Sequence, residues 1–315
     1  MIIGAMEHIA LQEGVVRLTE WGVIAVRGPD AASYLHNLLT QDVTHLQPQQ
    51  ARLAGLCSPK GRLMASFIVC KASDDEFLLL CSADLLAATL KRLSMFVLRA
   101  KCKLHDLGAE RVAFGLVGQS SLSWLGESAP SAAWEVRRRA ADVVIRLPDA
   151  DGQPRLILLQ EAGAPAPALP ALDAAHWSLL EVRSAVARVT AATAEQFVPQ
   201  MVNFELVGGV NFQKGCYPGQ EVVARSQYRG TLKRRAMLFG CDATLHAGQE
   251  VFHSDDAAQP AGIVVNAAPH RQGSTALVEV KLAALEGGAL HAGAPDGPAL
   301  RPLPLPYPLP VDATI

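Results

Sequence analysis

The chain has 315 residues, of which 50% are hydrophobic and 18% are charged, which is the composition of a globular protein with room for two domains. A net charge of −2 excludes the strongly basic footprint of tight, non-specific nucleic-acid binding. The six cysteines form no Cys-x-x-Cys pair and the nine histidines show no metal-ligand spacing, so we expect no metal site and a reducing compartment.

The beginning of the chain lacks the basic segment and the apolar run of a signal peptide. No apolar stretch reaches the length of a membrane span. We therefore expect a cytoplasmic protein with neither a membrane nor DNA as a partner.

Short apolar runs alternate with helical patterns over the first hundred residues. Gly28-Pro29-Asp30 opens a helix to about residue 40, because proline suits the first helical position. Ser82 can cap a second helix that runs to about Met95. Residues 96–104 look extended. Strands are predicted over residues 15–18, 23–26, 51–57, 63–70 and 77–81.

A second series of strands and helices follows from about residue 110. Strands are predicted over residues 112–117, 143–147 and 156–160, with helices over 120–125 and 172–189. The last helix has an apolar stripe of Leu172, Ala175, Leu179, Val182 and Val186. Two successive modules of this kind suggest an α+β region with a duplicated, ferredoxin-like arrangement.

The character of the chain changes past Lys233, where short strands alternate with turns. This pattern predicts a small C-terminal β-barrel or sandwich. The expected domains are therefore residues 1–232, with two subdomains split near residue 110, and residues 233–315. The proline-rich residues 301–310 must be extended, and we favour a strap across the domain over an SH3-type ligand.

One stretch stands out for its chemistry, Lys214-Gly-Cys-Tyr-Pro-Gly-Gln-Glu221. A strand over residues 210–212 should lead into a loop, and a helix should begin after Pro218. Cys216 then lies just before a helix N-terminus and two residues after Lys214, and both features favour a thiolate. The alternative is a buried, inert cysteine in a tight connection, and the local chemistry does not decide between them.

These residues resemble the signature of the YgfZ-type folate-binding proteins, Lys-Gly-Cys-Tyr-x-Gly-Gln-Glu. That family is related to the glycine-cleavage T-protein and supports iron–sulfur enzymes and tRNA modification. The resemblance covers nearly the whole chain. It extends to Phe197-x-Pro-Gln200, Gly208-Gly-Val210, Tyr228-Arg-Gly230, Thr40-x-Asp42 and Pro59-Lys-Gly-Arg62.

The resemblance implies that tetrahydrofolate or another reduced folate binds to Trp21 and Trp177, which match the family's folate-contacting tryptophans. Trp177 lies off the apolar stripe of its predicted helix, so the stripe does not account for it. Two tryptophans that flank one cavity suit a flat, aromatic pterin ring with polar edges. Ordinary core or surface tryptophans are the alternative.

The sequence departs from the catalytic relatives at three positions. The T-protein carries an Asp-Asp pair where this chain has Ala65 and Ser66, and Arg183 stands in place of a folate-contacting glutamate. Because alanine can neither accept a proton nor stabilise a developing cation, aminomethyl transfer is not expected.

The sequence therefore predicts a tetrahydrofolate-binding accessory protein that supports the assembly or repair of iron–sulfur enzymes. Its partners would be those client enzymes, including enzymes that modify tRNA, with tRNA involved indirectly. Cys216 would carry the activity with Lys214 beside it, either as a ligand of cluster iron or by redox chemistry. Two alternatives stay open, a folate-dependent one-carbon transferase that uses Cys216 and a tRNA-binding module.

Overall fold

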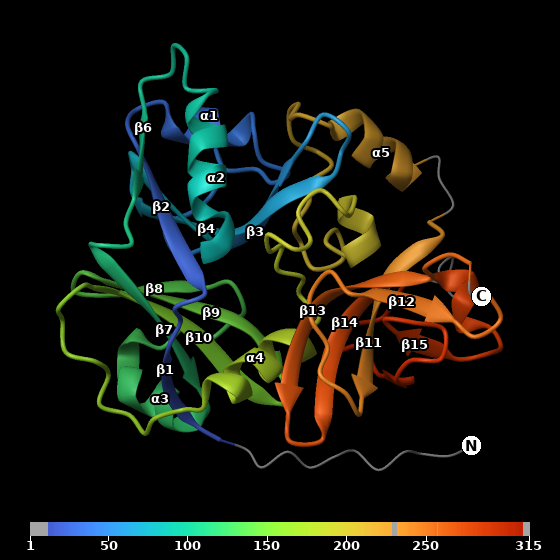
Figure 1. Cartoon of the computed structure of the whole chain (residues 1–315). Coiled ribbons are helices and arrows are strands. Elements are labelled where there is room, and N and C mark those ends of the chain that lie inside the picture. Colours follow the sequence, from blue (N-terminus) through green and yellow to red (C-terminus); the bar gives the residue numbers. More distant parts are fainter. Residues whose placement is uncertain (1–11, 229–231, 257, 311–315) are drawn as a thin grey trace.

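The computed structural model describes residues 12–228, 232–256 and 258–310, and within these ranges the fold is mixed α/β with three antiparallel sheets. Figure 1 shows the first sheet above the second, with the third sheet beside them. Within the same ranges, no helix has the length and apolar character needed to cross a membrane.

The first sheet has the strand order β3-β4-β5-β2-β6. Its strands are β2 (Trp21–Arg27), β3 (Ala51–Cys57), β4 (Leu63–Ser73), β5 (Glu76–Ser82) and β6 (Lys103–Asp106). Helix α1 (Ala31–His36) follows β2, and helix α2 (Ala83–Ser94) connects β5 to β6 and packs on the sheet. The helix packs closely because Gly22 leaves room for Leu86 on the face of β2.

The second sheet has the order β1-β7-β10-β9-β8. Its elements are β1 (Gly14–Arg17), β7 (Arg111–Val117), α3 (Gln119–Leu125), η1 (Gly126–Ser128), β8 (Val136–Arg139), β9 (Asp142–Ala150), β10 (Gln153–Glu161) and α4 (Ala174–Arg183). Strand β1 precedes the whole first sheet in the chain but pairs with β7. The chain therefore begins in the second sheet, leaves it to build the first, and then returns.

The third sheet contains six strands in the order β15-β12-β13-β14-β11-β16. Its elements are β11 (Arg234–Cys241), β12 (Glu250–His253), β13 (Gly262–His270), β14 (Gly273–Lys281), η3 (Leu282–Leu285), β15 (Leu290–Ala292) and β16 (Leu300–Leu303). The sheet curls, since an isolated bridge between His291 and Ala299 joins its two edges. The proline-rich tail is tied back to the body, where the Tyr307 hydroxyl donates to the carbonyl of Ala185 at 2.8 Å.

Three local predictions are wrong. The helix predicted over 172–189 ends at Arg183, because Ala185 adopts a left-handed backbone with φ 51° and the chain turns away. Residues 96–102 form turns, and only β6 beyond them is extended. Residues 210–212 form no strand, because the Asn211 amide bonds instead to the carbonyl of Thr40 at 2.9 Å.

The segment between α4 and the third sheet is mostly irregular, apart from η2 (Pro199–Val202) and α5 (Gln220–Tyr228). It is held by side-chain bonds to main chain: Thr40 donates to the carbonyl of Gly209 at 2.6 Å, and Asn203 donates to that of Ala236 at 2.7 Å. The motif residues Arg229 and Gly230 lie outside the described residues. The segment that leads into the signature stretch is therefore bound to the turn after α1 and to β11 of the third sheet.

A hydrophobic core fills the space between the first and second sheets. Val23, Ala25 and Leu80 from the first sheet pack with Ile145, Ile157 and Leu159 from the second, and Trp177 and Leu180 of α4 complete the cluster. The strands that contribute these residues are continuous apolar runs, because β2 and β10 are buried on both faces. The first candidate site lies within this layer.

Candidate functional site

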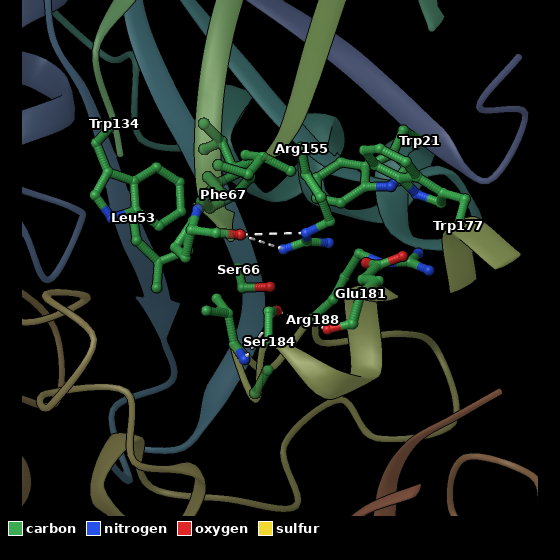
Figure 2. Close-up of a pocket in the computed structure, with 15 residues that line it drawn as sticks. Trp21, Leu53, Ser66, Phe67, Trp134, Arg155, Trp177, Glu181, Ser184 and Arg188 are labelled. Carbon is green, nitrogen blue, oxygen red and sulfur yellow. Dashed lines mark hydrogen bonds and ion pairs between the residues drawn. The ribbon is translucent and has the colours of Figure 1, made fainter. Parts of the chain in front are cut away.

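A pocket opens where the first sheet, the second sheet and α4 meet (Figure 2). Three tryptophans line it: Trp21 at the start of β2, Trp134 just before β8, and Trp177 in α4. The structure thus brings Trp21 and Trp177 together, and it adds a third tryptophan that sequence reasoning missed.

Trp177 is buried because its ring packs on the backbone of β7. It is 1% exposed, and a Cβ atom added to Gly115 would lie 2.5 Å from ring atom Cε3. The absence of a side chain at position 115 therefore creates the seat for the indole. Asp173 orients the helix by capping it, since its carboxylate accepts from the Ala175 amide at 2.9 Å. The indole N–H has no hydrogen-bond partner among the described residues.

Arg155 of β10 forms part of the inner wall and is only 2% exposed. Its Nε and Nη2 donate to the carbonyl of Pro148 at 3.2 and 3.1 Å, while Nη1 has no partner within the described ranges. The guanidinium lies 5.6 Å from the centroid of the Trp177 ring. Burial lowers the pKa of Arg155 to about 10, so the group remains charged at neutral pH.

An ion pair lies at another part of the pocket wall. Arg188 Nε donates to Glu181 Oε1 at 2.6 Å, and its Nη1 donates to the Ser82 hydroxyl at 2.9 Å. Its guanidinium also lies 5.1 Å from the centroid of the Trp21 ring. The early end of α4 makes this arrangement possible, because the chain turns back at Ala185 and brings Arg188 beneath Trp21.

The three positions that distinguish this chain from the T-protein have different places in the structure. Ser66 lines the pocket, but its hydroxyl accepts from the Val189 amide at 2.9 Å. Ala65 is fully buried in the hydrophobic core. Arg183 is not among the lining residues and pairs with Asp151 at 3.2 Å. The carboxylate that does line the pocket belongs to Glu181, two residues earlier in the same helix.

The signature loop forms a second candidate site, beside the end of α1 and the turn that follows it. Lys214 Nζ donates to two main-chain carbonyls. One is that of His36, the last residue of α1, and the other is that of Leu39, just after the helix, at 2.7 Å. Burial lowers the pKa of Lys214 to about 8, and Asp42 and Cys216 act in the opposite direction. Because its ammonium is bound to main-chain carbonyls, Lys214 fixes the loop on the end of α1 as well as placing charge near Cys216.

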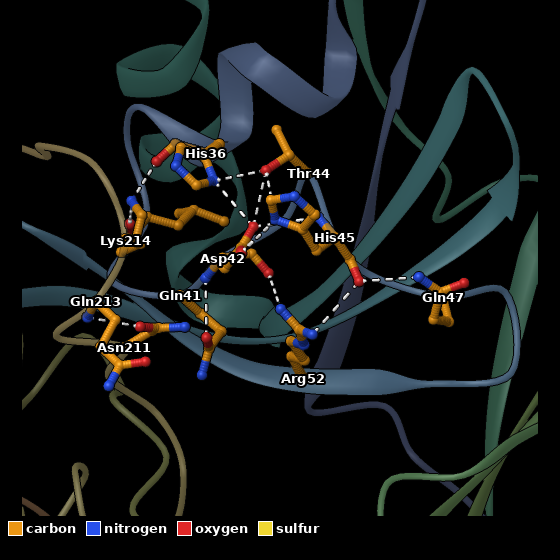
Figure 3. Close-up of polar contacts among 11 residues, drawn as sticks. His36, Gln41, Asp42, Thr44, His45, Gln47, Arg52, Asn211, Gln213 and Lys214 are labelled. Carbon is orange, nitrogen blue, oxygen red and sulfur yellow. Dashed lines mark hydrogen bonds and ion pairs between the residues drawn. The ribbon is translucent and has the colours of Figure 1, made fainter.

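A polar cluster stabilises the turn that carries these carbonyls (Figure 3). The Asp42 carboxylate accepts a hydrogen bond from the Thr44 hydroxyl at 2.8 Å. It also lies within hydrogen-bond distance of the Nδ1 atoms of His36, at 3.1 Å, and His45, at 2.7 Å. Burial alone would raise the pKa of Asp42, but the bonds from His45 and Thr44 outweigh it and hold the pKa well below its usual range. A fixed carboxylate therefore acts on the half-buried Lys214.

Gly219 sets the approach of α5 to the first sheet. It has φ +78°, and a Cβ atom there would lie 2.3 Å from the carbonyl oxygen of Ser58. The start of α5 thus packs directly on the turn formed by residues 58–61. Gly215 differs, since a Cβ atom at this position would make an ordinary 3.5 Å contact with His36 Nε2.

Cys216 differs from the other five cysteines in exposure. All six lie within the described ranges as free thiols, and of these only Cys216 is exposed. Burial raises the pKa of Cys57, Cys70 and Cys81 to about 12. The alternative that Cys216 is a buried cysteine is therefore wrong. Within the part of the chain that the structure describes, no group of three potential metal ligands occurs.

The two candidate sites are separate. No residue between 208 and 221 lines the tryptophan pocket. The structure therefore brings Trp21 to Trp177 and Lys214 to Cys216, but it does not bring the two pairs to one site. A ligand stacked on the tryptophans would not touch the Cys216 thiol within this pocket.

Comparisons with known proteins agree with this architecture. Residues 3–138 match the family described as the GCVT N-terminal domain. The fold is similar to that of glycine cleavage system aminomethyltransferase T from Bartonella henselae, with a TM-score of 0.71 over 92% of this chain and 85% of that one at 15% identity. The chain thus has the fold of the glycine-cleavage T-protein.

Sequence relatives narrow the class. The chain is 33% identical to the tRNA-modifying protein YgfZ of Edwardsiella ictaluri over 260 residues. The matched region covers 75% of this chain and 72% of that protein. It is also 27% identical over 308 residues to the protein of that name from Klebsiella pneumoniae, with 94% and 93% coverage. The chain belongs to the YgfZ family, as its signature stretch predicts.

Proposed function

We propose that this protein binds a reduced folate, tetrahydrofolate in the first instance, in the pocket lined by the three tryptophans. The observation that carries the proposal is that Trp21 and Trp177, which are far apart in the chain, line one pocket with Trp134. Flat indole faces suit a pterin, and the pocket also supplies guanidinium and carboxylate groups for its polar edges. The residues present therefore fit a folate.

Binding is measured by quenching of tryptophan emission on titration with tetrahydrofolate. Trp177→Phe keeps most of the buried volume and should weaken binding, and Trp21→Ala should do the same. Trp124 offers a matched control, because it lies in α3, stacks on Arg139 at 4.2 Å and does not line the pocket. Trp124→Ala should leave affinity unchanged. Wild-type affinity in both pocket variants would reject this placement.

The role proposed for the protein is support of iron–sulfur enzymes by assembly or repair of their clusters, in the cytoplasm. The relatives named as tRNA-modifying proteins support a link to client enzymes that modify tRNA, with tRNA reached through those enzymes. Cys216 is the group we assign to this activity, because it is an exposed thiol in the family signature, on the loop that leads into α5. Lys214 acts as its positioning residue.

The assignment of Cys216 is tested by complementation. A strain that lacks the protein is supplied with Cys216→Ala, and the activity of an iron–sulfur enzyme is assayed alongside the abundance of the variant. We expect normal abundance without rescue. Cys241→Ala serves as the control, because Cys241 is buried in the third sheet. Rescue by Cys216→Ala would assign the signature to the geometry of the turn.

A one-carbon transferase that uses Cys216 is the other candidate. The structure offers it no direct support, because Cys216 does not line the folate pocket. The carboxylate of the pocket, Glu181, is paired with Arg188 at 2.6 Å. An accessory role therefore fits the geometry better than catalysis of folate chemistry.

We also infer that the folate-binding region, residues 1–232, contains two copies of a ferredoxin-like unit. The orders β6-β2-β5-β4-β3 and β1-β7-β10-β9-β8 support this, because each places two hairpins and two helices in equivalent positions. In the second copy, β1 takes the place that β6 has in the first. Residues 233–315 would be a small β-barrel domain.

A further inference from the structure

The tryptophan pocket has an excess of hydrogen-bond donors that nothing in the described chain accepts. The indole N–H groups of Trp21 and Trp177 and the Nη1 group of Arg155 are all buried without partners among the described residues. All three residues line the same pocket. Buried donors are nearly always paired in folded proteins, so three such groups at one cavity indicate a ligand rich in acceptors.

Arg155 is the most costly of these donors, because it carries a charge. It is 2% exposed, and its two bonds to Pro148 end on a neutral carbonyl. Among the described residues it forms no ion pair, whereas the nearby Arg146 pairs with Asp149 at 2.8 Å. The carboxylates of Glu181 and Asp149 act on Arg155 without forming an ion pair with it. A buried cation with an unpaired donor lowers stability unless another group completes its hydrogen bonds. Such strain is typical of a binding site prepared for its ligand.

Figure 2 shows how Arg155 is directed. Trp134 lies on one side of the pocket and Trp21 and Trp177 lie on the other, and the guanidinium projects between them. A flat ring that stacks in this space would place its edge against Nη1. Because Arg155 is enclosed, it would meet the part of the ligand that enters first, while a long charged tail would remain towards solvent.

We propose that Arg155 is a specificity-determining residue, which donates from Nη1 to the oxygen at position 4 of the pterin ring. This inference rests on the proposed function, since it takes a folate as the ligand. It assigns a role to a residue outside the tryptophan pair. It also predicts which folate analogues the pocket binds weakly.

The chemical consequence is discrimination between 4-oxo and 4-amino pteridines. An amino group at position 4 presents donors to a group that is itself only a donor, so the contact becomes repulsive and Nη1 stays unpaired. Leaving a buried charged donor unpaired reduces affinity by about 10- to 100-fold. Wild type should therefore bind tetrahydropterin at least about 10-fold more tightly than its 2,4-diamino analogue.

The experiment measures dissociation constants for this pair of compounds with wild type, Arg155→Met and the control Arg146→Met. Methionine keeps much of the volume of Arg155 but has no donor. We expect Arg155→Met to lose the preference for the 4-oxo compound, and Arg146→Met to keep it, because Arg146 does not line the pocket. If Arg155→Met does not fold, Arg155→Lys should narrow the preference, since one flexible ammonium replaces a fixed fork.

The outcomes separate the two proposals. If wild type binds both compounds equally, or if Arg155→Met retains the preference, Arg155 does not read position 4 and this inference is wrong, although folate binding stands. If wild type binds neither pteridine nor tetrahydrofolate, the proposed function itself is wrong and this inference is rejected with it.

Discussion

Selective alkylation of Cys216 is the most direct test of the signature loop. Cys57, Cys70 and Cys81 are at most 2% exposed, and burial raises their pKa to about 12. At pH 7.5 a thiol of pKa 12 is thiolate in roughly 3 × 10⁻⁵ of molecules, so these three cysteines supply almost no nucleophile. Cys216 differs from them in exposure, since it is the exposed cysteine of the six and the reagent can reach its thiol.

The assay treats native protein with iodoacetamide at pH 7.5 and locates the label by peptide mass spectrometry. We expect one carbamidomethyl group, on Cys216, at a time when the other five cysteines remain unlabelled. Cys216→Ala should take up no label under the same conditions, and unfolding in urea should expose the remaining thiols. Labelling of a second cysteine on the same timescale, or an unreactive Cys216, would refute the reasoning from exposure.

Stability provides a second measurement on the same variant. An exposed side chain away from caps and cores contributes within about 0.5 kcal/mol, so Cys216→Ala should leave the melting temperature nearly unchanged. Cys70 is fully buried, and removal of its sulfur should cost about 1 kcal/mol, as removal of one buried methylene does. A large loss in Cys216→Ala would show that this thiol has a structural role.

Three further predictions follow from the geometry. Gly115→Ala should displace the Trp177 ring, cost about 1–3 kcal/mol in urea unfolding and weaken folate binding, and unchanged affinity would contradict the packing described. The pKa of Lys214 is lowered to about 8 in the folded state, so the unfolded chain binds more protons above pH 8 and stability should rise from pH 8 towards 10.5. Lys214→Met should lack that part of the rise, as seen by comparing urea midpoints at pH 7.5 and 10. Because residues 65 and 66 are Ala65 and Ser66, no transfer from an aminomethylated carrier protein to tetrahydrofolate is expected, and measurable turnover would show otherwise.

The sequence by itself determined the family and the local framework. The stretch from Lys214 to Glu221 identifies the family, because its residues set a local arrangement of loop, glycine turn and helix start. Most strands follow from short runs of apolar residues bounded by turns, a pattern that needs no knowledge of distant parts of the chain. The two expected folate tryptophans also came from the family match rather than from any physical pattern.

The tertiary structure alone decided what surrounds those tryptophans. The local sequence around Trp134, Arg155 and Gly115 is unremarkable. Trp134 and Arg155 line the pocket, and Gly115 makes room for Trp177, only because the folding of the second sheet brings their strands to this place. The early end of α4 likewise depends on the left-handed backbone at Ala185, whose carbonyl is bound by Tyr307 of the distant tail. Such contacts join residues far apart in sequence, and local propensity carries no information about them.

The separation of the two sites was equally hidden. Sequence reasoning named the tryptophans and Cys216 as functional residues, but it could not say whether they share a cavity. The structure seats Lys214 on the end of α1 and the tryptophans between two sheets, so the thiol and the pocket face different surroundings. The sequence supplies the functional side chains, while the packing of the sheets decides which of them come together, because burial of apolar faces acts over the whole molecule.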